Sequence, residues 1–470
     1  MRNIILLGSG VVAFVAIALC ISMVPAVNAS VAASFTPTST ITVEMWQLYD
    51  SGAKTATLCS QDAGIKYTWG CTAYCNNSDM CTRTRAVAYP FISENATVAI
   101  EGQDCAPEDS PYNCYLCDVV PAETSPALFH PTAVGAQAIT ARTYAYWHIR
   151  IDNVTPGPID NSSAYQVFVP YRYDTFSQGG RDIVDAALQG RDYLSNVSDY
   201  TVNLYVQNVS LTAEDPIFAE FFADIPLQTI SNPPHPNLVG VADPISSHPD
   251  VPSDGHGHGM SQGGAGRWAR GSSSYRCDPY PAPCPPPVPS VPFFAWSVSW
   301  PDRFQILTHY YTGVHVRNAG TSNNPVLTPP WRGNVLQVKW SRPGGDSAGI
   351  CSRIEVWLQN TGITTWYGAN GVSSKVGLGY CWNGSACVPA GYLPSNVALG
   401  GDLWATLVVP PGSGNGELQI AVYRQEWYGY YWSAPIWFSP DWPRQGIGTF
   451  SAGPTYCTRL PLIKRHEPVN

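Results

Sequence analysis

The hydrophobic and polar positions along the chain predict one main helix and several strands. Apolar and polar side chains alternate over residues 40–46, which indicates a half-buried strand. Residues 112–120 form a second apolar run, which we interpret as strand-like. From Pro131 onward, apolar residues recur every three or four positions, the spacing of an amphipathic helix with proline in its first turn. The apolar stripe consists of Val134, Ala138, Ala141, Ala145 and Ile149.

Regular alternation begins near residue 331 and predicts strands over residues 331–440. Groups of alternating apolar residues are separated there by glycine, proline and asparagine, which favour turns. Short strands at such intervals are typical of a β-sandwich. The groups are Leu336, Val338 and Trp340; Ile354, Val356 and Leu358; Leu403, Ala405 and Leu407; and Leu418, Ile420 and Val422.

Length and local composition divide the chain further. A chain of 470 residues exceeds what one hydrophobic core usually organises, so we expect several domains. A stretch rich in proline, glycine, histidine and serine interrupts the middle of the chain and contains PAPCPPPVPSVP. We predict an α+β protein with an export segment (1–33), a cysteine-rich β region (40–110), a mixed core (111–316) with a proline-rich insertion (272–301), an all-β sandwich (331–440) and a tail (441–470).

The first 33 residues predict export from the cytoplasm. Arg2 precedes an apolar, uncharged run over residues 4–24, and small residues follow at Ala29 and Ala33. This is the pattern of a signal peptide. The run also reaches the roughly 20 residues that span a bilayer, so an uncleaved anchor is the alternative. We therefore expect an extracytoplasmic protein that is either secreted or anchored by this segment.

The cysteines fit an exported protein. The chain contains 14 of them, and proteins outside the cytoplasm normally form disulfides. Cys114 and Cys117 form a CxxC motif that suits a disulfide or a zinc ion, although no second pair has the spacing of a zinc ribbon. Cys277 and Cys284 are placed to close the proline-rich loop. We expect disulfides rather than metal at these positions.

Charge and motif content exclude several function classes. The net charge is −9 and lysine and arginine form no run, so we exclude a nucleic-acid partner. Phosphate-binding loops and dinucleotide fingerprints do not occur, and we expect no cofactor. Aromatic residues make up 12% of the chain, which suits sugar ligands, although such residues more often pack in cores.

Three separated segments form an ordered set of motifs. They are CDVVPAETSPALFHPTAVGAQAITARTYAYWH (117–148), DGHGHGMSQGGAGRWARG (254–271) and FQILTHYYTG (304–313). In order and residue identity they resemble the VVxxE, AQAxxARTYA, GHGxGMSQxGA and ILxxYYxG patterns of the sporulation protein D family (SpoIID, amidase enhancer). The resemblance extends over residues 112–316.

The resemblance implies a lytic transglycosylase, which cleaves the bond between N-acetylmuramic acid and N-acetylglucosamine in peptidoglycan and leaves a 1,6-anhydro end. The glutamate of VVxxE falls on Glu123, which becomes the general acid and then the base. One carboxyl suffices because the substrate's own 6-hydroxyl attacks C1, so no second carboxylate is needed to activate water or to attack the sugar. Apolar neighbours such as Val120 and Phe129 suit a pocket that raises its pKa. Without the resemblance, Glu123 fits a solvated loop carboxylate or a helix-start acid.

The resemblance also implies substrate-binding residues on the predicted helix and on the loop in which glycine alternates. For the arginine, pairing with a structural carboxylate is the alternative. For the two histidines, the alternatives are structural hydrogen bonding and a metal. No carboxylate or cysteine stands at a suitable spacing along the chain, so we predict no metal site. The residues are Gln137, Arg142, Tyr144, His256, His258, Ser261 and Gln262.

The chain departs from the family pattern at positions that keep other functions open. Gly135 replaces a lysine before AQA, and residues 224–234 replace a glycine-rich segment. One alternative is a non-catalytic peptidoglycan-binding protein that stimulates a separate cell-wall amidase. Another is a surface scaffold that binds glycan. In each case we expect peptidoglycan strands as partner, a location at the cell wall, and membrane contact only through residues 1–33.

The C-terminal region has a weaker resemblance, to immunoglobulin-like modules of the four-tryptophan type. The segments concerned are EVWLQNTGITTW (355–366), LGYCW (378–382) and VALGGDLWATLVVPP (397–411). Their tryptophans suit either a sandwich core or stacking on sugar. We expect a wall-targeting or partner-binding module.

Overall fold

A computed structural model of the protein describes a defined part of the chain. The predicted export segment, most of the proline-rich insertion and the proposed Cys277–Cys284 disulfide lie outside it. The described residues are 35–44, 46–50, 81–85, 95–101, 114–152, 159–160, 165–168, 172–203, 208–249, 251–273, 296–341, 353–410, 416–438, 445–452 and 457–458.

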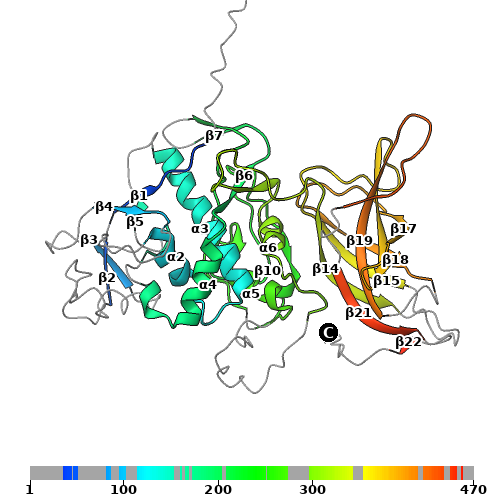
Figure 1. The fold of residues 1–470 in the computed structure, drawn as a ribbon, viewed down its shortest axis with the longest axis horizontal. Helices are drawn as coiled ribbons and strands as arrows, with labels where there is room; N and C mark the ends of the chain where they lie inside the picture. The colour runs from blue at the N-terminus through cyan, green and yellow to red at the C-terminus, as the bar shows by residue number, and fades with distance from the viewer. Residues whose placement is uncertain are drawn as a thin grey trace, which may run out of the picture. The chain divides into compact units, whose positions relative to one another are not determined.

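The protein is of the α+β class, as predicted (Figure 1). The helix expected from Pro131 is α3 (Pro131–Asp152), and its stripe from Val134 to Ala145 is buried. α3 contacts each of the other described helices. These are α2 (Tyr115–Glu123), α4 (Gln178–Leu188), α5 (Gln262–Arg270) and α6 (Arg303–Tyr310). Within the described part of the chain, no helix is both long and apolar enough to cross a membrane.

The strand predicted over residues 112–120 is wrong, because this segment forms helix α2. All residues from Tyr115 to Pro121 are buried, so apolar side chains surround the helix and no one-sided periodicity remains to be recognised. The Cys114 sulfur accepts a hydrogen bond from the Cys117 N–H and caps the first turn. Tertiary packing thus decides the structure of a segment that is too uniformly apolar to be assigned by pattern.

The expectation of one main helix omitted α4, α5 and α6. Helix α5 contains three glycines in nine residues, a composition with poor intrinsic helix propensity. Its ends are nevertheless well capped. The Ser261 hydroxyl accepts from the Gly264 N–H, and Gly271 ends the helix in the left-handed conformation, with φ of 67°.

The first part of the described chain contains small sheets rather than one large sheet. β1 pairs with β4 and β5, and the other strands form pairs: β2 with β3, β6 with β13, β7 with β8, β9 with β12, and β10 with β11. The strand expected over residues 40–46 corresponds to β1. The bounds are β1 Thr40–Glu44, β2 Trp46–Asp50, β3 Cys81–Arg85, β4 Asn95–Ala99, β5 Ile159–Asp160, β6 Asp192–Asn196, β7 Tyr200–Asn203, β8 Asn208–Leu211, β9 Phe221–Phe222, β10 Leu227–Gln228, β11 Ala242–Asp243, β12 Met260–Ser261 and β13 Val314–Asn318.

The C-terminal strands form two larger antiparallel sheets, in the orders β14-β15-β18 and β17-β16-β19-β21-β22, with β20 paired to β19. Each predicted alternating group lies on a strand, and apolar residues of both sheets, such as Val356 and Ile420, share one buried cluster. The bounds are β14 Gly333–Ser341, β15 Arg353–Asn360, β16 Ser374–Trp382, β17 Val388–Tyr392, β18 Asp402–Val408, β19 Gly416–Glu426, β20 Ile436–Trp437, β21 Gln445–Ala452 and β22 Cys457–Thr458.

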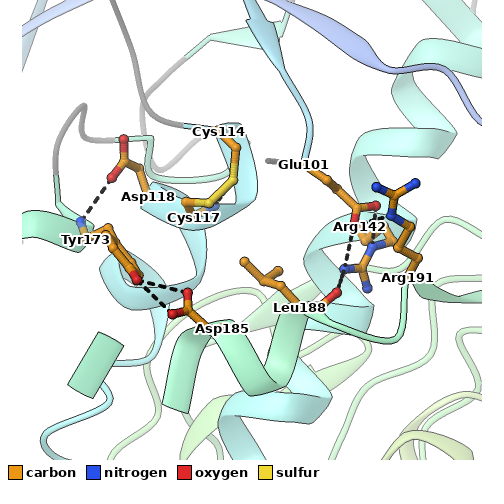
Figure 2. The surroundings of a disulfide bond; sticks show 9 residues. All are labelled: Glu101, Cys114, Cys117, Asp118, Arg142, Tyr173, Asp185, Leu188 and Arg191. Atoms are coloured by element: carbon orange, nitrogen blue, oxygen red, sulfur yellow. Dashed lines mark hydrogen bonds and ion pairs between the residues drawn. A yellow bond between two sulfur atoms is a disulfide. The ribbon is translucent and has the colours of Figure 1, made fainter. Parts of the chain in front are cut away.

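A disulfide stands at the start of α2. Cys114 and Cys117 are bonded to each other, so the CxxC motif forms the expected disulfide (Figure 2). One turn further, the Asp118 carboxylate accepts from the Tyr173 N–H at 3.0 Å, and the Tyr173 hydroxyl donates to Asp185 of α4 at 2.9 Å. The disulfide therefore fixes the start of helix α2, and the hydrogen bonds of Tyr173 connect the helix to α4. A second disulfide joins Cys381 to Cys387.

Helix α5 is held by a buried polar network around Asp224. The Arg267 guanidinium donates to both carboxylate oxygens of Asp224, and both side chains are nearly excluded from solvent. The Ser261 hydroxyl donates to Asp224 at 3.1 Å. Ser246 accepts from Arg267 and donates to the buried Asp243, which also accepts from the Trp268 indole. A single carboxylate therefore holds both the start and the middle of α5.

We predict that Asp224→Asn destabilises the protein by about 3–5 kcal/mol, because it removes the carboxylate that pairs directly with the buried Arg267 guanidinium. The measurement is denaturant unfolding of wild type and variant. Asp182→Asn is the matched control, since Asp182 is exposed and accepts from Gln178, one turn earlier in α4; its effect should stay within about 0.5 kcal/mol. Equal effects for the two variants would contradict the role given to Asp224.

Candidate active site

Glu123 is the last residue of α2, and its half-buried carboxylate lies between two hydrogen-bond donors. The Val167 backbone N–H donates to Oε1 at 2.7 Å. The Gln262 side-chain amide donates to Oε2 at 3.0 Å. Neither partner carries a charge. The Glu123 carboxyl group is therefore held at both oxygens by neutral donors.

The surroundings of Glu123 favour its protonated form. Burial raises the pKa of the carboxyl above the ordinary value of 4.5, and this effect outweighs the Val167 and Gln262 hydrogen bonds, which lower it. The group therefore keeps its proton at pH values where an ordinary glutamate has lost it. A carboxyl whose pKa is raised is better suited than an ordinary glutamate to donate a proton and afterwards accept one.

Gln262 reaches Glu123 because of the backbone that precedes it. Gln262 is the first residue of α5, and β12 (Met260–Ser261) pairs in parallel with β9 (Phe221–Phe222). Gly259 has a φ of +74°, and a Cβ at this position would lie 2.0 Å from the Glu220 carbonyl oxygen. Only glycine fits both conditions. The other alternating glycines of this loop, Gly255 and Gly257, also have positive φ.

Gln137 is buried, and within the described part of the chain neither atom of its amide has a hydrogen-bond partner. Residues three and seven positions apart share a helix face, so Gln137 lies on the face of α3 that carries Thr140 and Tyr144. The Thr140 hydroxyl contacts the sulfur of Met260, two residues before Gln262. An unpaired buried amide is costly, and a ligand at this face would supply the partners it lacks.

Arg142 lies elsewhere. Its fully buried guanidinium pairs with Glu101 at 2.8 Å and donates to the carbonyl oxygen of Leu188 (Figure 2). It also donates to the carbonyl oxygen of Asp192. Arg142 thus forms an ion pair of the kind that the structural alternative describes. Tyr144 is also buried, and its ring stacks on Phe218 at 5.6 Å between centroids.

The two histidines of the loop are tied to its backbone and to a distant carboxylate. One ring nitrogen of His256 lies 3.1 Å from the Phe221 carbonyl oxygen, and Nδ1 accepts from the His258 N–H. His258 Nδ1 lies 3.4 Å from the Glu220 carboxylate. Ser261, in turn, caps α5 and donates to Asp224, so its hydroxyl is fully engaged.

Sequence reasoning missed three participants: the Val167 N–H, Asp224 and Glu220. A backbone donor leaves no signal in residue identity. Asp224 and Glu220 lie about forty residues before the loop they bind, where nothing in local spacing connects them to it. Of the predicted site residues, the structure brings Glu123 and Gln262 into direct contact.

Comparison with known proteins gives one match. The model of the SpoIID family, described as Stage II sporulation protein, matches residues 105–190, which include Glu123 and α3. No curated protein and no solved structure matches the chain. The match supports a sporulation-related function at the cell wall.

We predict that Gly259→Ala destabilises the protein by clearly more than Gly384→Ala. Both glycines have φ above +70°, so both variants carry the strain of the left-handed region, about 1–2 kcal/mol. A Cβ at Gly384 meets nothing within 4 Å, whereas one at Gly259 collides with the Glu220 carbonyl. Denaturant unfolding separates the collision from the strain. Identical losses in the two variants would show that the backbone at residue 259 has no tight neighbour.

We predict that wild type loses stability relative to Glu123→Gln as pH rises above 4.5. The pKa of Glu123 is raised in the folded protein, so the stability linked to its protonated form is complete below the unfolded value and disappears as pH passes the folded value. The slope reaches about 1.4 kcal/mol per pH unit. Urea unfolding of both proteins across the pH range measures it, with the exposed Glu417→Gln as control for loss of one charge. A slope of opposite sign would refute the assignment.

Proposed function

We propose that the protein is a peptidoglycan lytic transglycosylase in which Glu123 alone supplies the acid and base catalysis. The observation that carries the proposal is the half-buried Glu123 carboxyl with a raised pKa, held by neutral donors. A hydrolase that activates water needs a second carboxylate, whereas a transglycosylase does not, because an oxygen of the substrate attacks instead. The family match over residues 105–190 also supports a function at the cell wall.

The proposed reaction balances with one carboxyl. The protonated Glu123 gives its proton to the glycosidic oxygen between N-acetylmuramic acid and N-acetylglucosamine, and the bond from C1 to that oxygen breaks. The 6-hydroxyl of the muramic acid then attacks C1 and forms the 1,6-anhydro ring. The Glu123 carboxylate takes up the proton of that hydroxyl, which restores the starting state of the enzyme.

The neighbours of Glu123 suit both stages. Burial keeps the acid protonated before bond cleavage, and the donors at Val167 and Gln262 stabilise the carboxylate after it. The unpaired amide of Gln137 is proposed to bind a sugar hydroxyl or the N-acetyl group. The roles of Arg142 and Ser261 are proposed to be structural, because their hydrogen bonds are already directed to Glu101 and Asp224.

The replacement of lysine by Gly135 does not leave its surroundings without a cation. The Arg303 side chain packs against Gly135, where an added Cβ would lie 3.2 Å from its Cδ. Its guanidinium pairs with Asp192 at 2.9 Å. We propose that Arg303 supplies positive charge near residue 135. We also propose that the protein acts outside the membrane, at the cell wall where the substrate lies. Stimulation of a separate amidase remains the second candidate function, favoured by the altered residue 135.

We predict that purified glycan strands incubated with wild type yield 1,6-anhydromuramic ends, and that Glu123→Gln reduces the yield by at least about a hundredfold, the usual contribution of a general acid. Mass spectrometry of the products measures both. Glu417→Gln, which removes an exposed carboxylate, is the matched control and should retain activity.

Release of nothing by wild type, with strand binding intact in both proteins, would rule out catalysis and favour the binding or amidase-stimulating role. Products with reducing muramic ends would instead show hydrolysis by water. The mass of the muramic end distinguishes 1,6-anhydro products from products with reducing ends.

A further inference from the structure

A histidine and carboxylate cluster lies beside the loop that leads to Gln262. Glu220 immediately precedes β9, and His256 and His258 precede β12, which pairs with β9. One ligand atom from each of these three side chains lies within 4.8 Å of the other two. No local sequence pattern indicates this cluster, because its carboxylate lies 36 residues before the first histidine in the chain.

We propose that Glu220, His256 and His258 form a binding site for a divalent transition-metal ion, with zinc as the best fit. Two imidazoles and one carboxylate are a common ligand set for catalytic or accessible zinc, with water in the fourth position. His258 Nδ1 and Glu220 Oε2 are 3.4 Å apart. Two ligands at bond lengths of about 2.0–2.1 Å in tetrahedral geometry are separated by about 3.4 Å, so this pair already has the required spacing.

The surroundings of the cluster favour such a site. The Asn232 amide donates to Glu220 Oε2 at 2.9 Å and orients the carboxylate, as outer partners of metal ligands usually do. His256 is exposed, so its ring is free to exchange a backbone hydrogen bond for the metal, and water can reach the open position. His258 and Glu220 are half-buried and therefore restricted in position.

The proposed metal ion positions the loop before Gln262 and takes no part in the cleavage of the substrate. A metal held by both segments fixes the glycine-alternating loop to the residue before β9, and Gln262 begins α5 four residues after His258. Metal binding thereby restricts the amide that contacts Glu123. This inference stands independently of the proposed transglycosylase activity, since it depends only on the three side chains and their spacing.

The test uses the full exported chain, oxidised, stripped with chelator and titrated with zinc chloride in a calorimeter. We expect one zinc ion per chain and a rise in melting temperature on binding. His258→Ala and Glu220→Gln should abolish the binding, and Asn232→Ala should weaken it by about 10- to 100-fold, as loss of an outer partner does. The half-buried His315→Ala on β13 is the matched control and should bind as wild type.

Cobalt(II) in place of zinc provides a second readout that does not depend on stability. Ligation by nitrogen and oxygen gives visible d–d bands without a thiolate charge-transfer band, which separates this site from one formed by cysteines. Zinc binding that persists in His258→Ala, a thiolate band, or a wild type that binds no zinc would overturn the proposal. In the last case the cluster is a hydrogen-bonded contact between His258 and Glu220 and nothing more.

Discussion

The position of the candidate acid depends on the buried pair of Asp224 and Arg267, although neither residue touches it. The pair fixes α5 through its middle, and the same carboxylate accepts from Ser261 at the helix start. Gln262 follows directly and donates to Glu123. Because a buried guanidinium requires its counter-ion, α5 has one stable position, and the amide at its first residue is fixed with it. Charge pairing in the interior thus determines the geometry of an uncharged hydrogen bond at the site.

Glu123 receives its chemical character from two opposing arrangements. The disulfide and the Asp118 contact hold the beginning of α2, so the carboxyl at its end is set into apolar surroundings. Those surroundings raise the pKa, while two neutral donors keep the ionised form accessible. A cation at the same place would stabilise the carboxylate and remove the proton that an acid needs. An amide and a backbone N–H are therefore suitable partners for a carboxyl group that must both hold and release a proton.

The sequence predicts a good part of this structure where periodicity or turn chemistry is strong. The α3 stripe and the C-terminal strands follow from one-sided burial. It predicts Glu123 and Gln262 only through motif resemblance. The helix at α2 is missed because uniform burial removes periodicity, and α5 because its glycines have low helix propensity. Glu220 is missed because a contact made by folding has no local signature.

The contact between Glu123 and Gln262 joins residues that are 139 positions apart in the chain. Such a contact forms only when the chain between the two residues has closed into a loop, which costs conformational entropy. A chain that has emerged only as far as α3 contains the carboxyl but lacks the amide that holds it. The site is therefore complete only once α2 and α5 have both formed and come together.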